Sequence, residues 1–283
     1  MRKKRLKVLL AGTLTLLVII YHAELPSLTR EETVFLPTES YEAEALPQLP
    51  SSTPLETQET ILQAPEQEER AAEIPVTSWP KLSDGFIYLK EALPDAQFDV
   101  RYATSHNFTG QVVEGYGSDH IFCTLEAAEA LKKVNTLVSE KGYGLLIYDA
   151  YRPKRAVDFF IQWGDTPEDN KTKEEFYPDF DKKDLFKLGY LAKRSAHSRG
   201  STIDLTLYAR DTGEPLDMGS PYDFLGPISN HDTELITEEQ TRNRNILREA
   251  MKASGFKELR TEWWHYQLIN EPFPQTFFDF PIQ

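Results

Sequence analysis

Two histidines and two carboxylates stand in a pattern that suits a metal-dependent hydrolase. His197 and Asp204 are separated by a short segment containing Gly200, and Glu262 and His265 are separated by two tryptophans. Two imidazoles and one carboxylate are a common ligand set for catalytic zinc, which leaves its fourth position to water. Iron(II) and manganese also accept such ligands. We expect His197, Asp204 and His265 to hold a metal ion and Glu262 to activate its water.

The segment from Ser201 to Tyr208 must position one of these ligands. Its residues alternate in character, which predicts a half-buried strand with a polar face that is free for a site. Gly200, just before the strand, would let the chain turn and bring His197 to the same metal as Asp204. The apolar face consists of Ile203, Leu205 and Leu207, and the other face of Thr202, Asp204, Thr206 and Tyr208.

Glu262 and His265 belong to a second predicted element, a hairpin with strands over 256–259 and 263–269. On an ideal strand Glu262 and His265, three residues apart, would point to opposite faces. We therefore expect a bend or bulge near Trp263 and Trp264. These two tryptophans either pack in the core or narrow the substrate pocket.

An arginine follows directly on a third predicted strand. The apolar run from Gly144 to Ala150 reads as a short buried strand, and Tyr151-Arg152-Pro153 comes next. An arginine fixed at a strand end can hold an oxyanion in a transition state. The alternative is an arginine that pairs with a carboxylate.

The remaining signals predict helices between these strands. Thr124 is a candidate N-cap for a helix that stops at Gly142, and Pro153 suits the first turn of another. Thr237 and Gln240 form a capping-box pattern for a helix that ends near Gly255. The mixed order, without regular strand–helix alternation, indicates an α+β fold whose central antiparallel sheet is flanked by helices.

The amino-acid composition limits which classes of partner and which kinds of site the chain can have. The chain of 283 residues has a net charge of −14, which argues against a nucleic-acid partner. The single cysteine, Cys123, excludes an intrachain disulfide and a cysteine-based zinc site, and we expect it to be a small buried residue.

The N-terminal residues predict export. Five basic residues within positions 1–7 precede an apolar run from Val8 to Tyr21, which is the pattern of a signal peptide or of a short uncleaved anchor over residues 1–23. Residues 24–78 hold seven Pro, twelve Glu and no Gly, and we expect a disordered tether that a membrane anchor could hold. Residues 79–283 would then form the catalytic domain in the periplasm or at the cell surface, secreted or anchored.

Residues 80–283 closely resemble the D-alanyl-D-alanine dipeptidases of the vancomycin-resistance type, within the wider D,D-peptidase and hedgehog-like group of zinc peptidases. The zinc motifs alone indicate the wider group, whereas Tyr151–Val157 and Glu262–Tyr266 together indicate the dipeptidase branch. The matching blocks are Asp99–Thr104, Asn107–Gly110, Gly142–Leu146, Tyr151–Val157, Ser195–Ser201, Ile203–Tyr208, Asp211–Gly213, Met218–Ser220, Glu262–Tyr266 and Phe278–Pro281.

The resemblance implies one zinc ion and a set of roles. His197, Asp204 and His265 would be the zinc ligands, Glu262 the general base and Arg152 the stabiliser of the transition state. Ser195 and Asp223 would meet the free ammonium of D-alanyl-D-alanine, the small-molecule substrate.

Two alternatives stay open. A D,D-carboxypeptidase that trims the terminal D-alanine of peptidoglycan stem peptides would fit the export signal, because that substrate lies outside the membrane. The resistance enzymes, by contrast, lack such a leader and work in the cytoplasm. A non-catalytic, zinc-stabilised binding module is a second alternative, although such a module would not need both Glu262 and Arg152.

Overall fold

A five-stranded sheet forms the centre of the computed structural model, which describes residues 81–166 and 170–283. The strand order is β2-β4-β5-β7-β6; β2 pairs with β4 in parallel, and the other neighbours are antiparallel. The predicted α+β class with a central antiparallel sheet is confirmed, with one parallel edge strand added. The strands are β2 (Gln97–Phe98), β4 (Tyr143–Asp149), β5 (Thr202–Ala209), β6 (Phe256–Leu259) and β7 (Glu262–Leu268).

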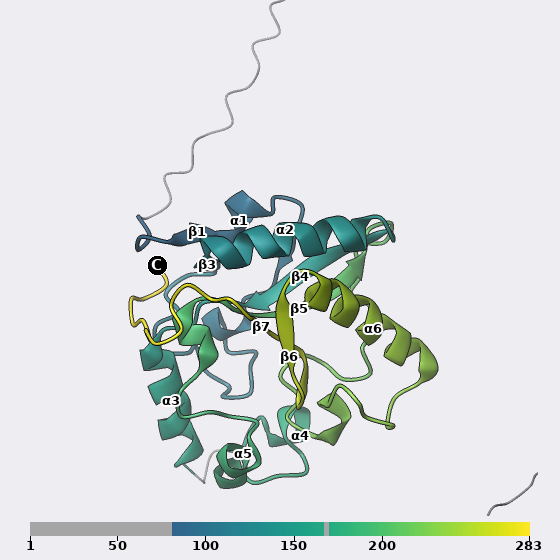
Figure 1. Ribbon diagram of the computed structural model, residues 1–283. Helices are drawn as coiled ribbons and strands as arrows, with labels where there is room; N and C mark the ends of the chain where they lie inside the picture. Colours follow the sequence, from purple (N-terminus) through teal and green to yellow (C-terminus); the bar gives the residue numbers. More distant parts are fainter. Residues whose placement is uncertain (1–80, 167–169) are drawn as a thin grey trace, which may run out of the picture. The chain divides into compact units, whose positions relative to one another are not determined.

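Helices lie on both sides of this sheet (Figure 1). Helices α2 and α6 pack together and against β4 and β6, and α3 to α5 gather on the other side. A small second sheet pairs β1 (Phe86–Tyr88) with β3 (Phe122–Thr124). The helices are α1 (Leu89–Ala92), α2 (Leu125–Ser139), α3 (Lys154–Gly164), α4 (Lys173–Phe176), α5 (Lys182–Leu188) and α6 (Glu238–Ala253), with short 3₁₀ turns η1 (Arg101–Ala103), η2 (Ala196–Arg199) and η3 (Pro227–Ser229).

The helix boundaries follow the capping residues in the sequence. The Thr124 hydroxyl accepts from the backbone N–H of Ala127 and opens α2. At α6 both halves of the predicted capping box between Thr237 and Gln240 are present. Pro153 is the residue before α3 rather than part of its first turn, because its backbone is extended (ψ 149°). The expected helices are thus confirmed, and α2 and α6 end three and two residues before Gly142 and Gly255.

The sheet is buried on both faces, which corrects the expectation for β5. Register pairs Ile147 with Leu205, and these two share the face that α2 and α6 cover. The second face of β5 was expected to be open, yet Thr202, Thr206 and Tyr208 on it are also buried. The segment between β5 and α6 provides part of this cover.

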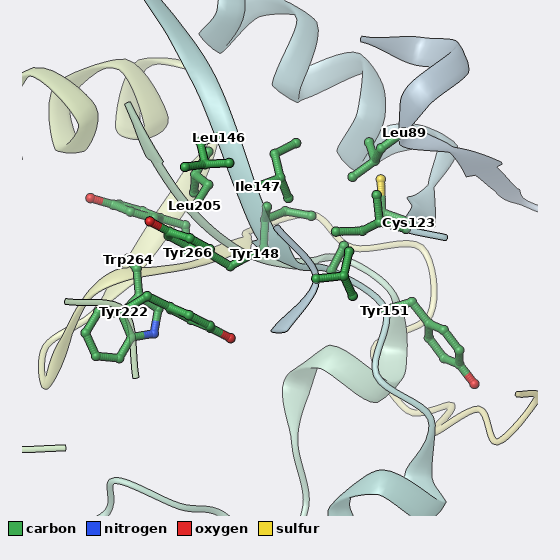
Figure 2. Close-up of a cluster of buried hydrophobic side chains, with 14 of the residues drawn as sticks. Leu89, Cys123, Leu146, Ile147, Tyr148, Tyr151, Leu205, Tyr222, Trp264 and Tyr266 are labelled. Atoms are coloured by element: carbon green, nitrogen blue, oxygen red, sulfur yellow. The ribbon is translucent and has the colours of Figure 1, made fainter. Parts of the chain in front are cut away.

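Aromatic packing anchors that covering segment on the sheet (Figure 2). The Tyr222 ring stacks on Tyr148 of β4 with a centroid separation of 4.3 Å, and its edge meets Trp264 of β7 at 5.5 Å. Trp263 and Trp264 are buried and do not line the cavity that Asp204 and His265 line, so these two tryptophans pack in the core rather than narrow a substrate pocket. Cys123 is buried as well, as expected.

The N-terminal predictions concern residues that lie outside the described ranges. They are the export segment 1–23 and the tether 24–78, and both stay predictions. Among the described helices, none has the length and apolar character needed to cross a membrane.

Candidate metal centre and substrate pocket

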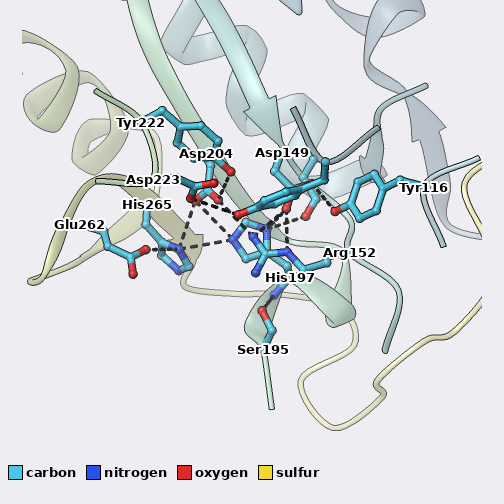
Figure 3. Close-up of polar contacts among 12 residues, drawn as sticks. Tyr116, Asp149, Arg152, Ser195, His197, Asp204, Tyr222, Asp223, Glu262 and His265 are labelled. Atoms are coloured by element: carbon cyan, nitrogen blue, oxygen red, sulfur yellow. Dashed lines mark hydrogen bonds and ion pairs between the residues drawn. The ribbon is translucent and has the colours of Figure 1, made fainter. Parts of the chain in front are cut away.

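A cavity of about 250 Å³ lies where β5 and β7 meet the segment around η2. Six of the seven residues singled out in the sequence line it: Arg152, Ser195, Asp204, Asp223, Glu262 and His265. The seventh, His197, is buried directly beside Asp204 (Figure 3). The fold therefore brings together residues that are more than 100 positions apart in the chain.

The three expected ligands form a nearly regular triangle. The Asp204 Oδ1 atom lies 3.3 Å from His197 Nε2 and 3.1 Å from His265 Nδ1, and the two ring nitrogens are 3.3 Å apart. Ligand atoms at the usual zinc distance of about 2.1 Å in a tetrahedron would be separated by about 3.4 Å. Asp204 Oδ1 is buried, and no conventional hydrogen bond from the described residues reaches it. The donor set thus fits one tetrahedral zinc ion.

The sheet register and a tight turn create this triangle. Asp204 on β5 and His265 on β7 are directly paired across the two strands. His197 comes from η2, which Ser195 caps and which ends at Gly200 with φ of +82°. A Cβ atom on Gly200 would lie 2.4 Å from the Phe86 ring, so both the turn and the packing require glycine there.

A hydrogen bond fixes which nitrogen His197 offers to a metal. Its Nδ1–H donates to the Ala150 carbonyl oxygen at 2.7 Å, so Nε2 keeps its lone pair and faces Asp204. Asp149 Oδ2 also lies close to this ring, 3.4 Å from His197 Nδ1. Contacts with Asp149 of β4 and with Ala150, the residue that follows this strand, therefore orient the His197 ring.

Glu262 reaches the same place because β7 bulges, as the sequence predicted. Tyr266 pairs with Glu258, and Glu262 pairs with Leu259, which is the next residue of β6. The three residues of β7 in between, Trp263 to His265, therefore have no register partner on β6. As a result, Glu262 Oε2 lies 3.4 Å from His265 Nδ1. This places the carboxylate beside the metal position, where a bound water would sit.

The electrostatics of the centre favour a cation. Burial opposes protonation of His265, but the Asp204 and Glu262 carboxylates beside its ring outweigh this effect and raise the pKa of His265 to about 9. Asp204 is buried too, yet the facing imidazoles hold its pKa below the ordinary value. Both shifts show that the two carboxylates attract positive charge at the point where the ligand atoms converge.

The position of Arg152 is compatible with both roles that the sequence left open, holding an oxyanion and pairing with a carboxylate. Its Nε donates to Asp149 Oδ2 at 2.9 Å, and one Nη lies 3.4 Å from Asp204 Oδ2. The guanidinium also lies over the Tyr102 ring, 5.0 Å from its centroid, and lines the cavity. Arg152 is thus held by a carboxylate and at the same time presented to the pocket.

Asp223 is a buried carboxyl that lacks a partner on one oxygen. Its Oδ1 accepts from the Tyr102 hydroxyl at 3.1 Å, while Oδ2 is buried without a hydrogen bond. Burial and the nearby charge of Asp204 raise its pKa well above the ordinary value. The backbone of Asp223 is left-handed, with φ of +64°. A cationic group in the cavity would satisfy the free oxygen and allow the carboxyl to ionise.

Ser195 lies in the cavity wall, where its hydroxyl oxygen accepts from the backbone N–H of His197 at 3.2 Å. The hydroxyl therefore helps to shape the η2 turn. Its expected contact with the substrate stays a prediction.

Three residues of the centre were not predicted from the sequence. They are Asp149, Tyr116, which donates to Asp149 Oδ1 at 2.8 Å, and Tyr102. For Asp149 a signal existed, since it is the one acidic residue of an otherwise apolar predicted strand and stands three residues before Arg152. A carboxylate that is buried in a strand requires partners.

Known proteins resemble this chain closely. A family model described as D-ala-D-ala dipeptidase matches residues 82–283. The D-alanyl-D-alanine dipeptidases of Enterococcus faecalis and Enterococcus faecium are each 48% identical, over 71% and 70% of this chain and 100% and 98% of their own lengths. That of Streptomyces coelicolor is 44% identical over 71% of this chain and 100% of its own length.

Proposed function

This chain belongs to the D-alanyl-D-alanine dipeptidase family, and we infer from that premise and from the centre described above that it hydrolyses D-alanyl-D-alanine to two molecules of D-alanine. It is a zinc-dependent metallopeptidase. The observation that carries the inference is that Glu262, Arg152 and Asp223 line one small cavity together with Asp204 and His265, two of the three ligands, and that His197 is buried beside them.

The residues of the centre divide into holding and reacting groups. His197, Asp204 and His265 would hold the zinc ion. When bound, zinc supplies Lewis acidity that makes a water molecule more acidic and polarises the peptide carbonyl. Glu262 accepts the proton of the attacking water and later passes it to the leaving amine. Arg152 stabilises the negative charge that develops on the carbonyl oxygen.

The position of Asp223 favours a dipeptide over a longer peptide as the substrate. Asp223, whose Oδ2 has no hydrogen bond, lines a cavity of about 250 Å³, which is below the range of about 300–1,000 Å³ that is typical of pockets for drug-sized ligands. A free substrate ammonium would pair with this carboxylate. A longer peptide would bring an uncharged amide there instead and leave the carboxylate buried without a counter-ion.

The direct test measures D-alanine release by the purified, zinc-loaded protein. It is given D-alanyl-D-alanine and, separately, a stem pentapeptide that ends in the same two residues, with Glu262→Gln as the control for contaminating activity. Release from the dipeptide alone is the expected result. Release from the pentapeptide at a comparable rate would identify a D,D-carboxypeptidase instead. Zinc binding without release from either substrate would identify a non-catalytic module.

We also propose that the domain acts outside the cytoplasmic membrane, as a secreted or an anchored protein. The basic residues before Lys7 and the apolar run from Val8 to Tyr21 support this location. Protease added to intact spheroplasts should degrade the domain or find it already released, whereas a chain that is protected until lysis would contradict the proposal. N-terminal sequencing of the product would separate cleavage from anchoring.

A further inference from the structure

Arg244, on α6, is a buried arginine that bonds to three backbone carbonyls of one loop. Its Nε donates to the carbonyl of Met218 at 2.6 Å, Nη1 to that of Asn230 at 2.9 Å and Nη2 to that of Ile228 at 3.0 Å. Only 2% of the residue is exposed. Because the guanidinium is a rigid planar fork, these bonds hold the beginning and the end of the loop 218–230 together.

The loop closed in this way carries Asp223 between its two ends. The left-handed backbone of Asp223 is unfavourable for a residue with a Cβ atom. Such a conformation persists where the surrounding structure fixes it. The three carbonyl bonds of Arg244 lie on both sides of Asp223 in the chain, so they constrain the segment that must hold this conformation.

The same loop is joined to the strand that carries the general base. The Trp263 indole N–H donates to the Ser220 hydroxyl at 2.9 Å, and that hydroxyl is 2.9 Å from the hydroxyl of Ser229. The Arg244 guanidinium lies over the Trp263 ring, 5.7 Å from its centroid. Since Trp263 directly follows Glu262, the loop and the base belong to one hydrogen-bonded unit.

We propose that Arg244 is a positioning residue for substrate selection, which closes the loop 218–230 and thereby holds the Asp223 carboxyl against the cavity for a substrate with a free ammonium group. Arg244 acts through the loop, because it is not one of the residues that line the cavity. The inference rests on the proposed role of Asp223.

The test compares Arg244→Met and Arg244→Lys with the unaltered full-length, zinc-loaded protein. For Arg244→Met we expect KM for D-alanyl-D-alanine to rise by about tenfold or more while kcat changes by less than about threefold, the signature of lost substrate binding. Cleavage of N-acetyl-D-alanyl-D-alanine relative to the free dipeptide should rise, and zinc content should stay the same. Amide hydrogen exchange should become faster within 218–230 and not in β4 or β5. Arg244→Lys, which keeps a donor, should show smaller changes of the same kind.

Arg248→Met is the matched control on the same helix. Arg248 is half-buried and pairs with Glu258 and with Asp232, at 3.0 Å from the latter, so its loss weakens the packing of α6 without removing a carbonyl bond of the loop. It should lower the Tm and leave KM unchanged. If Arg244→Met only lowers the Tm in the same way, with unchanged KM and unchanged selectivity, Arg244 is a structural residue and the proposal is overturned.

Two further variants keep the outcomes distinct. Asp223→Asn tests the premise: if it does not alter the preference for a free amino group, the proposed role of Asp223 fails, and the inference fails with it. If Asp223→Asn abolishes the preference while the Arg244 variants keep it, only the inference fails. Should Arg244→Met not fold, Arg244→Lys and Ser220→Ala carry the test, and an unchanged KM in both overturns the proposal.

Discussion

Asp204 and His265 face each other as direct partners across the antiparallel strands β5 and β7, with their ligand atoms 3.1 Å apart. On its other side Asp204 is the register partner of Asp149, so the three residues form a row across β4, β5 and β7. A shift of register by one residue would turn a strand's side chains to the opposite face. The metal centre is therefore a property of the strand pairing, to which η2 adds His197.

Replacement of His265 by alanine should remove the metal. The variant loses one of three ligands, and with it the imidazole that lies beside both Asp204 and Glu262. Elemental analysis of the purified protein should show far less than one zinc per chain, and a chelator should lower the Tm of the unaltered protein but not of the variant. His106→Ala, which removes an exposed histidine paired with Glu175, is the control and should keep its zinc. A His265→Ala protein with one zinc per chain would refute the ligand assignment.

Glu262→Gln should separate zinc binding from turnover. The amide keeps the size of the side chain but cannot accept the proton of water, so we expect kcat to fall by about 10²–10⁴-fold with zinc content unchanged. Steady-state kinetics together with metal analysis test this. Activity near that of the unaltered protein would remove Glu262 from its role as general base.

Asp149→Asn should weaken zinc binding although Asp149 is not a ligand. Its carboxylate accepts from Arg152 and lies 3.4 Å from His197 Nδ1, so it orients one ligand and the oxyanion-stabilising arginine. Loss of such an outer contact commonly costs about 10–100-fold in metal affinity or activity. Competition with a chromophoric chelator measures the affinity, and Tyr116→Phe, which removes one hydrogen bond to Asp149, should have a smaller effect in the same direction.

Asp223→Asn should relax the demand for a free amino group. The amide has no charge to offer to an ammonium, so KM for D-alanyl-D-alanine should rise by about tenfold or more, as expected for a lost charge-assisted hydrogen bond. The loss should be smaller for the N-acetylated dipeptide, whose amino group carries no charge. An equal loss for both substrates would show that Asp223 shapes the pocket without recognising the ammonium.

Glu258 should contribute a pH-dependent part of the stability, away from the metal centre. Hydrogen bonds from Arg248 lower the pKa of Glu258 from 4.5 to about 2. Because the folded-state pKa is the lower one, the contribution is complete above about pH 4.5 and is lost as the pH falls toward 2. Urea unfolding of Glu258→Gln should therefore show a deficit at neutral pH that disappears near pH 2. In a double variant with Arg248→Met the deficit should not add, and full additivity would exclude this pair as its source.

Most of the elements could be predicted because their signals are local. Thr124, Thr237 and Gln240 mark helix starts through contacts within one turn, and such contacts depend little on the rest of the fold. The bulge before His265 was also predictable, because a strand's alternation conflicts with two functional residues three positions apart.

The partners of the centre were harder to predict, because they depend on tertiary contacts. The exposed polar face expected for β5 is buried, since Tyr222 from a later segment covers it by stacking on Tyr148. The link from Arg244 to the loop around Asp223 runs through backbone carbonyls, and no residue type marks a carbonyl in a sequence. Periodicity and spacing indicate which face a residue occupies, but not what will be packed on it.

The bulge in β7 makes two catalytic tasks separately adjustable. His265 is fixed by its pairing with Asp204 on the β5 side of the strand, whereas Glu262 depends on how Trp263, Trp264 and His265 loop out from the pairing with β6. An insertion, deletion or exchange between Glu262 and His265 can change the reach of the base and leave His265 in register with Asp204. During evolution, or in the hands of an engineer, this strand could acquire a new proton acceptor without losing its metal.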